Sequence, residues 1–132
     1  MIKNKDLIVF LMARFNVNSP DEITQEMMDG VTRLIITTGR NPFLDNDPEL
    51  YMDSVITNTF KDFHDLDGFS KLNTLIISGL NPCAIFYVPS SINQLYALNC
   101  ENCILKLQGH TYFLKKDITF GYRKMAPKKS AL

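Results

Sequence analysis

The chain has 132 residues, 45% of them hydrophobic, and its 14 basic side chains balance its 14 acidic ones. This length is typical of one domain with a single core, and the lack of net charge argues against a dedicated nucleic-acid or anionic-membrane protein. The longest apolar run near the N-terminus, residues 7–12, is too short for a membrane span and has no signal-peptide cleavage site, so we expect no membrane partner.

Two short helices are predicted at the N-terminal end. Residues 3–15 place apolar side chains at roughly helical spacing, with charged residues between them. Pro20 after Ser19 suits the start of a second helix, which continues over residues 23–28 and ends at Gly30. We therefore expect residues 1–30 to form a helical cap.

The pattern of apolar residues changes after Gly30 from helical spacing to a run typical of a strand. Residues 31–38 are rich in β-branched side chains, which predicts a strand. Residues 40–59 hold several turn-forming residues, which indicates an insertion loop. Residues 125–132 have little to bury, so we expect one domain over residues 1–124 followed by a disordered basic tail.

A repeat appears in the second half of the chain. Shifting the sequence by 23 residues places Leu72 opposite Leu95 and Leu75 opposite Leu98. Residues 95–105 follow the pattern L-x-x-L-x-L-x-x-N/C-x-L, with Cys100 in place of one leucine, and residues 72–80 form a weaker copy. The segment from Val31 to Ile36 fits the strand part of the same pattern, 41 residues before the Leu72 copy.

Over about residues 20–107 the chain resembles leucine-rich-repeat proteins. Residues 23–34 are similar to the helical cap of internalin-type repeats, and residues 88–95 are similar to the Leu-Pro segment of short bacterial effector-type repeats. The resemblance implies an α/β fold, a short leucine-rich-repeat solenoid with parallel β-strands at about 31–37, 73–78 and 96–101. The helical N-terminal cap would cover one end, and a C-terminal β-hairpin over residues 104–114 the other.

In such a solenoid, the strand residues between the inward leucines point to a concave face. Exposed Ile35 and Ile76 beside Tyr96 and Arg33 would combine the aliphatic, aromatic and arginine side chains that binding hot spots favour. We predict that another protein binds this face through Arg33, Ile35, Asn73, Ile76, Ser78, Tyr96, Asn99 and Glu101. The alternative is that these are ordinary strand residues, with Ile35 and Ile76 covered by a terminal segment.

The cysteines offer a second hypothesis, a small zinc- or thiol-dependent protein. Cys100 and Cys103 form a C-x-x-C motif that Cys83 and His110 would complete as a zinc site. The repeat places Cys100 and Cys103 at inward positions, however, so we predict buried core residues, with no metal and no cofactor. An odd number of cysteines also fits a reducing, cytoplasmic setting.

Enzymatic chemistry finds little support in the sequence. His64 and Asp65 match part of a metal-dependent phosphohydrolase ligand set, but only His110 remains to extend it, so we predict a surface turn. No phosphate-binding loop and no nucleophile with histidine and acid partners can be assembled, so we expect neither an enzyme nor a small-molecule substrate. The basic residues over 123–129 leave contact with nucleic acid or an acidic protein as a minor alternative.

Overall fold

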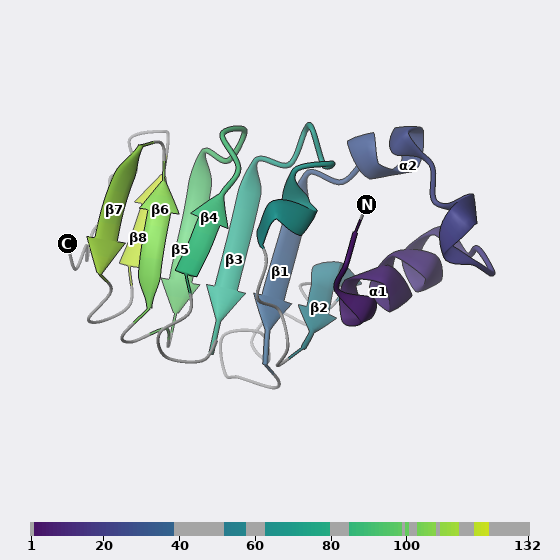
Figure 1. The fold of residues 1–132 in the computed structure, drawn as a ribbon, viewed down its shortest axis with the longest axis horizontal. Helices are drawn as coiled ribbons and strands as arrows, with labels where there is room; N and C mark the ends of the chain where they lie inside the picture. The colour runs from purple at the N-terminus through teal and green to yellow at the C-terminus, as the bar shows by residue number, and fades with distance from the viewer. Residues whose placement is uncertain are drawn as a thin grey trace.

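The fold combines a parallel-strand sheet, a second smaller sheet and a few helices. The computed structural model describes residues 2–38, 52–57, 63–79, 85–98, 100, 103–107, 109–113 and 118–121. In Figure 1 the strands stand side by side, with the N-terminal helices at one end and β7 at the other. Within these described residues, no helix is long and apolar enough to cross a membrane.

The N-terminal segment forms α1 (Lys5–Phe15), a 3₁₀ turn η1 (Pro20–Glu22) and α2 (Gln25–Asp29). The side chain of Asn4 caps α1 by accepting a hydrogen bond from the backbone N–H of Leu7 at 3.0 Å. Both predicted helices are confirmed, although the second is divided into η1 and α2. Leu7 and Leu11 of α1 are fully buried in the main core, which fixes the helix beside β2.

The first sheet has five strands in the order β2-β1-β3-β5-β8. They are β2 (Ser54–Ile56), β1 (Arg33–Thr37), β3 (Thr74–Ser78), β5 (Gln94–Leu98) and β8 (Ile118–Gly121). β1, β3 and β5 pair in parallel, as predicted, and β2 pairs in parallel with β1, whereas β8 is antiparallel to β5. One correction concerns β2, because it lies inside the predicted insertion loop at 40–59. Residues 40–51, 58 and 59, like the predicted tail at 125–132, lie outside the described residues.

The second sheet consists of β4 (Ile85–Val88), β6 (Ile104–Leu107) and β7 (His110–Phe113), in the order β4-β6-β7. β4 and β6 are parallel, while β6 and β7 form the predicted C-terminal hairpin. Figure 1 shows this sheet in front of β3, β5 and β8. Val88 and Leu105 are buried in the same core cluster as Leu75 and Leu95, so the two sheets enclose one apolar layer.

One turn recurs before three strands of the first sheet. The backbone N–H groups of Val31, Leu72 and Ile92 donate to the carbonyl oxygens of Met28, Phe69 and Pro89, each at 3.1 Å. Each turn is followed two residues later by a strand, β1, β3 or β5. The same local geometry therefore repeats along the chain, with an apolar side chain entering the core at the end of each turn.

The observed register corrects the predicted repeat. Leu34 lies opposite Leu75, as the predicted offset of 41 residues requires. Leu75, however, lies opposite Leu95, and Leu98 lies opposite Ser78. The period between β3 and β5 is therefore 20 residues, as in the Thr74–Gln94 pair, and not 23. Because Ile92, Leu95 and Leu98 are spaced three residues apart, the sequence fits an offset of 20 residues as well as one of 23. The position of the backbone turn before β5 fixes the offset at 20.

Candidate functional site

The predicted concave face corresponds to the face of the first sheet that points away from the second sheet. The register places Ile35, Ile76 and Tyr96 in one row across β1, β3 and β5. The predicted shift of 23 residues would instead pair Ile76 with Asn99 and Asn73 with Tyr96. The difference follows from the observed offset of 20 residues between β3 and β5. Changing the offset by three residues, an odd number, brings Ala97 into the core in place of Leu98.

Burial overturns the expected accessibility of this row. Ile35 is 0% exposed and Ile76 4%, and Tyr96 packs against these two isoleucines. Ser78, two residues further along β3, is 1% exposed. The sequence alone suggests that strand residues alternating with core leucines face solvent, yet β1 and β3 are apolar on both faces. A covered row of this kind stabilises the fold and leaves no free isoleucine for a partner to contact.

The remaining predicted residues are scattered. Asn73 is exposed at the start of β3, Tyr96 is half-buried, and Asn99 and Glu101 lie outside the described residues. The side chain of Arg33 is 42% exposed, but it already binds a carboxylate. The structure therefore does not bring the eight predicted residues together as one accessible surface.

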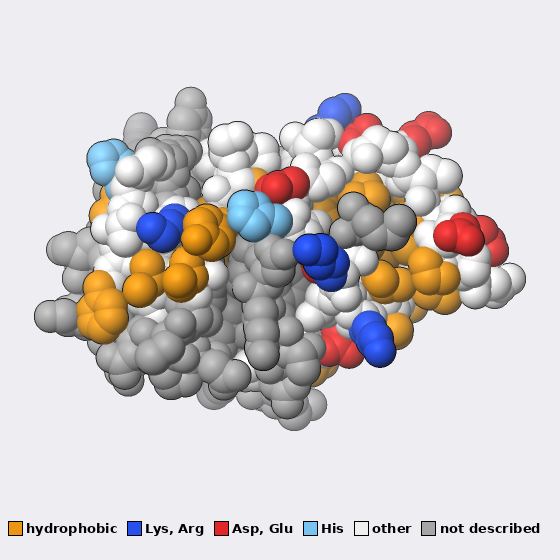
Figure 2. Space-filling view, viewed as in Figure 1, with side chains coloured by type: hydrophobic (Ala, Val, Ile, Leu, Met, Phe, Trp, Pro, Cys, Tyr) orange, Lys and Arg blue, Asp and Glu red, His pale blue; other side chains and the backbone are white. Residues whose placement is uncertain are grey.

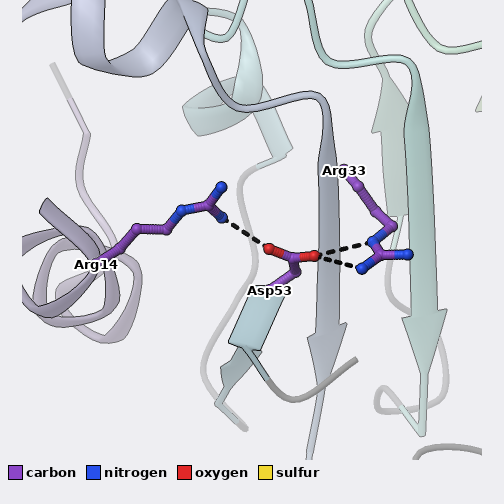
Figure 3. A network of polar contacts seen from close by, with 3 residues as sticks. All are labelled: Arg14, Arg33 and Asp53. Carbon is purple, nitrogen blue, oxygen red and sulfur yellow. Dashed lines mark hydrogen bonds and ion pairs between the residues drawn. The ribbon is translucent and has the colours of Figure 1, made fainter. Parts of the chain in front are cut away.

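Arg33 takes part in a three-residue polar network (Figure 3). Its guanidinium donates from Nε and Nη2 to Asp53 Oδ2, at 2.9 and 2.6 Å. Arg14 on α1 donates to Asp53 Oδ1 at 2.8 Å. Asp53 directly precedes β2, so one carboxylate joins α1 to β1 and the start of β2. Because both arginines are distant from Asp53 in sequence, no local sequence motif predicts this contact.

The cysteines have the environment predicted for core residues. Cys100 is 2% exposed and Cys103 0%, and neither is part of a disulfide. The Cys100 thiol donates to the carbonyl oxygen of Leu98 at 3.2 Å. His110 is exposed on β7, and Cys83 lies outside the described residues. Among the residues that the structure describes, no three His, Cys, Asp or Glu side chains are grouped so as to hold a metal ion.

His64 and Asp65 lie in the 3₁₀ turn η3 (Phe63–Leu66), and the two side chains differ in exposure. Asp65 is 6% exposed and accepts hydrogen bonds from the backbone N–H groups of Lys3 and Asn4, at 2.9 and 2.8 Å. The prediction of a surface turn is thus correct for His64, which is 60% exposed, and wrong for Asp65. Asp65 holds the N-terminal segment, a role that the dipeptide does not reveal.

The outer face of the second sheet carries the exposed apolar residues that the predicted concave face lacks. We define this outer face by its side chains pointing away from the core: Ile85, Tyr87, Ile104, Lys106, Thr111 and Phe113. Ile85 is 38% exposed, Tyr87 40% and Phe113 51%. In Figure 2 these apolar side chains gather on the left half of the visible surface, around a lysine and beside a histidine.

The outer face has two rows, each crossing the three strands. Ile85 lies opposite Ile104, which lies opposite Phe113, and this row is apolar. Two residues further along, Tyr87 lies opposite Lys106, which lies opposite Thr111. No strand is predicted from the sequence at residues 85–88. The four consecutive aromatic and β-branched residues of this segment are the signal that could have identified the strand.

A cleft of about 420 Å³ opens at the polar row. Its walls include His64, Asp67, Tyr87, Lys106 and His110. The His64 ring stacks on Tyr87, with centroids 4.9 Å apart and planes inclined by 24°. Lys106 Nζ donates to Thr111 Oγ1 at 3.4 Å, and His64 Nδ1 lies 3.3 Å from Asp67 Oδ2. The cleft thus places aromatic, cationic and hydroxyl groups beside the apolar row.

A second hollow, of about 480 Å³, lies between α1 and β2. Phe10, Ala13 and Met52 form its apolar lining, and the Arg14–Asp53 pair forms its polar side. Because Asp53 binds Arg14 and Arg33 at once, the charged groups of this hollow are already paired.

Comparisons with known proteins gave no match, whether to a family model, to a curated protein or to a solved structure. Function is therefore inferred from the two sheets and their surfaces.

Proposed function

We propose that the protein is a non-enzymatic module that binds a partner protein through the outer face of the second sheet. The observation that carries this proposal is the exposure of Ile85 and Tyr87 on β4 and of Phe113 on β7, the two strands that flank β6. Large apolar side chains gathered on a rigid sheet are typical of interaction surfaces, and tyrosine is enriched among binding hot spots.

We further infer that the architecture is a short leucine-rich-repeat solenoid. The recurring turn before β1, β3 and β5 supports this inference, as does the stacking of Leu34, Leu75 and Leu95 in one inward column. In a solenoid each repeat contacts mainly its neighbours, and the extended surface that results is suited to binding proteins. We also propose a reducing, cytoplasmic location, because Cys100 and Cys103 are buried in the core without being joined in a disulfide.

The outer face is a better candidate than the face predicted from the sequence. On the predicted face Ile35 and Ile76 are covered, and Arg33 is engaged by Asp53. On the outer face the exposed apolar side chains and Lys106 are adjacent across the strands. A partner would bury this surface without first displacing a structural contact.

Site-directed photo-crosslinking in the native host tests the location of the interface. A crosslinking residue at position 85 or 113 should capture one and the same protein. The same residue at position 9 should not capture it, because Val9 is 64% exposed but lies on α1. Capture from position 73, directly before β3, with none from 85 or 113, would return the site to the first sheet and contradict the proposal.

The captured protein, once purified, allows a quantitative test. Tyr87→Ala should weaken its binding by about thirtyfold, the scale of a hot-spot truncation. Tyr96→Ala is the matched control, because Tyr96 packs against the covered Ile35 and Ile76 and should leave binding within about twofold. Equal binding by the wild-type and Tyr87→Ala proteins would contradict the outer face as the site.

A further inference from the structure

The cleft beside Tyr87 is lined by groups that favour a negative charge. Lys106 supplies an ammonium group, and His64 and His110 add imidazole rings that can donate hydrogen bonds. Ser90 and Thr111 contribute hydroxyl groups. These donors come from η3, from the end of β4 and from the β6–β7 hairpin, so they surround the hollow from several directions.

The acidic side chain among the described lining residues is Asp67, and its charge is directed to His64. The two side chains approach to 3.3 Å at the edge of the cleft, and both are more than half exposed. Lys106 is paired with Tyr87 across the strands, in the middle strand β6 of the sheet, and donates to the neutral hydroxyl of Thr111. Within the described part of the chain the ammonium group thus faces a neutral hydroxyl and no carboxylate, so Lys106 is suited to pair with an anion of a ligand.

The apolar row lies next to this charge. Ile104 and Lys106 are two residues apart on β6 and point to the same side, which separates them by about 7 Å. Neighbouring side chains of an extended peptide that face the same way have the same spacing. A peptide with an acidic side chain at one position and an apolar side chain two positions away therefore matches both rows.

We propose that the cleft is an anion subsite for the carboxylate of an acidic side chain in the partner. In this arrangement the carboxylate binds Lys106 and Thr111, and the adjacent apolar side chain packs on Ile85, Ile104 and Phe113. This proposal rests on the proposed function, since it names the chemistry of the partner segment that the outer face takes. Charge complementarity carries it: the hollow offers a cation and several hydrogen-bond donors.

A titration with synthetic peptides, followed by amide resonances in NMR spectra, tests the subsite. The probe is a pentapeptide with blocked ends that carries leucine at position 2, glutamate at position 4 and serine elsewhere, and its counterpart replaces the glutamate by glutamine. The glutamate peptide should shift the resonances of Gly109, Thr111 and Lys106 and bind at least about fivefold more tightly than the glutamine peptide. Equal binding of the two peptides would overturn the proposal.

The variant Lys106→Gln should reduce the affinity for the glutamate peptide to that of the glutamine peptide. Lys5→Gln is the matched control, because Lys5 is exposed on α1 and should leave the affinity unchanged. Inorganic phosphate serves as a second probe. If phosphate shifts the same resonances while the glutamate peptide does not, the cleft binds small anions and the peptide assignment is wrong.

The experiments distinguish a failure of the proposed partner interface from a failure of the proposed anion subsite. Crosslinking from positions 85 and 113 combined with equal binding of both peptides would leave the interface in place and remove the anion subsite. Selective binding of the glutamate peptide at Lys106, combined with crosslinking only from position 73, would keep the subsite and move the partner interface to the first sheet.

Discussion

The thiol of Cys100 lies in the core just after β5, where it donates to the carbonyl oxygen of Leu98. Replacing it by alanine removes packing contacts without leaving a polar group unsatisfied. We expect Cys100→Ala to lower the free energy of unfolding by about 1 to 2 kcal/mol, measured by urea denaturation. A chelator should leave both curves unchanged, whereas stoichiometric zinc in protein purified without added metal would contradict this expectation.

Asp29 links α2 to the turn that precedes β3. Its carboxylate accepts hydrogen bonds from Gln25 and Ser70, both at 2.8 Å, and these bonds lower the pKa of the carboxyl below its ordinary value of 3.8. A lowered pKa in the folded state means that the contribution to stability is present above the unfolded value. It is lost as the pH falls through the folded value.

The lowered pKa of Asp29 determines how the stability of the Asp29→Asn variant should depend on pH. Asparagine resembles the protonated carboxyl, so the variant should be less stable than the wild type at neutral pH. The difference should be smaller at about pH 3, because the wild-type carboxyl takes up a proton as the pH falls through its folded-state pKa. Urea midpoints at both pH values provide the measurement, and a difference that persists undiminished in acid would show that the charge of Asp29 is not the cause.

At the scale of elements, β3 is a strand with both faces covered. Ile76 is 4% exposed on the face away from the second sheet, so a charge at this position has no water to solvate it. We expect Ile76→Asp to destabilise the protein by about 3 kcal/mol or more, and Ile76→Val by about 1 kcal/mol. Thermal melts of the two variants give the comparison; an aspartate variant as stable as the wild type would mean that this face is open.

The β6–β7 hairpin depends on its turn. Gly109 has a φ angle of 85°, which side-chain-bearing residues rarely adopt, although a Cβ atom there would meet nothing within 4 Å. Gly109→Val should therefore destabilise the protein by about 1 to 2 kcal/mol through backbone strain alone. Gly30→Ala is the control, because Gly30 has an ordinary φ angle of −84° at the end of α2. Equal stabilities of Gly109→Val and the wild type would rule out this strain.

For the whole molecule, the sequence predicts elements whose signals are local. The spacing of apolar residues identifies α1, the β-branched run identifies β1, and Gly109 between two apolar stretches identifies the hairpin. The repeat predicts parallel strands, but its frame is ambiguous because Ile92, Leu95 and Leu98 are equally spaced. Backbone hydrogen bonds of the turn resolve that ambiguity, and they are not visible in the sequence pattern.

The site was harder to predict, because accessibility is a property of the assembled chain. Alternation along β3 assigns Ile76 to the opposite face from Leu75, but it does not say whether that face is covered. The outer face depends on pairing β4 with β6 and on the stacking of His64 on Tyr87. These contacts join segments about twenty residues apart, so they follow from the packing of the sheets and not from any motif.

The reversed direction of β8 has a consequence for polymerisation. Strands that stack in parallel leave an edge that accepts a further parallel strand, and identical chains can use such edges to grow filaments. β8 pairs with β5 in the opposite direction and occupies that edge, while α1 lies beside β2 at the other end. A strand of a second copy therefore cannot pair with that edge of β5, because β8 already takes up its backbone hydrogen bonds.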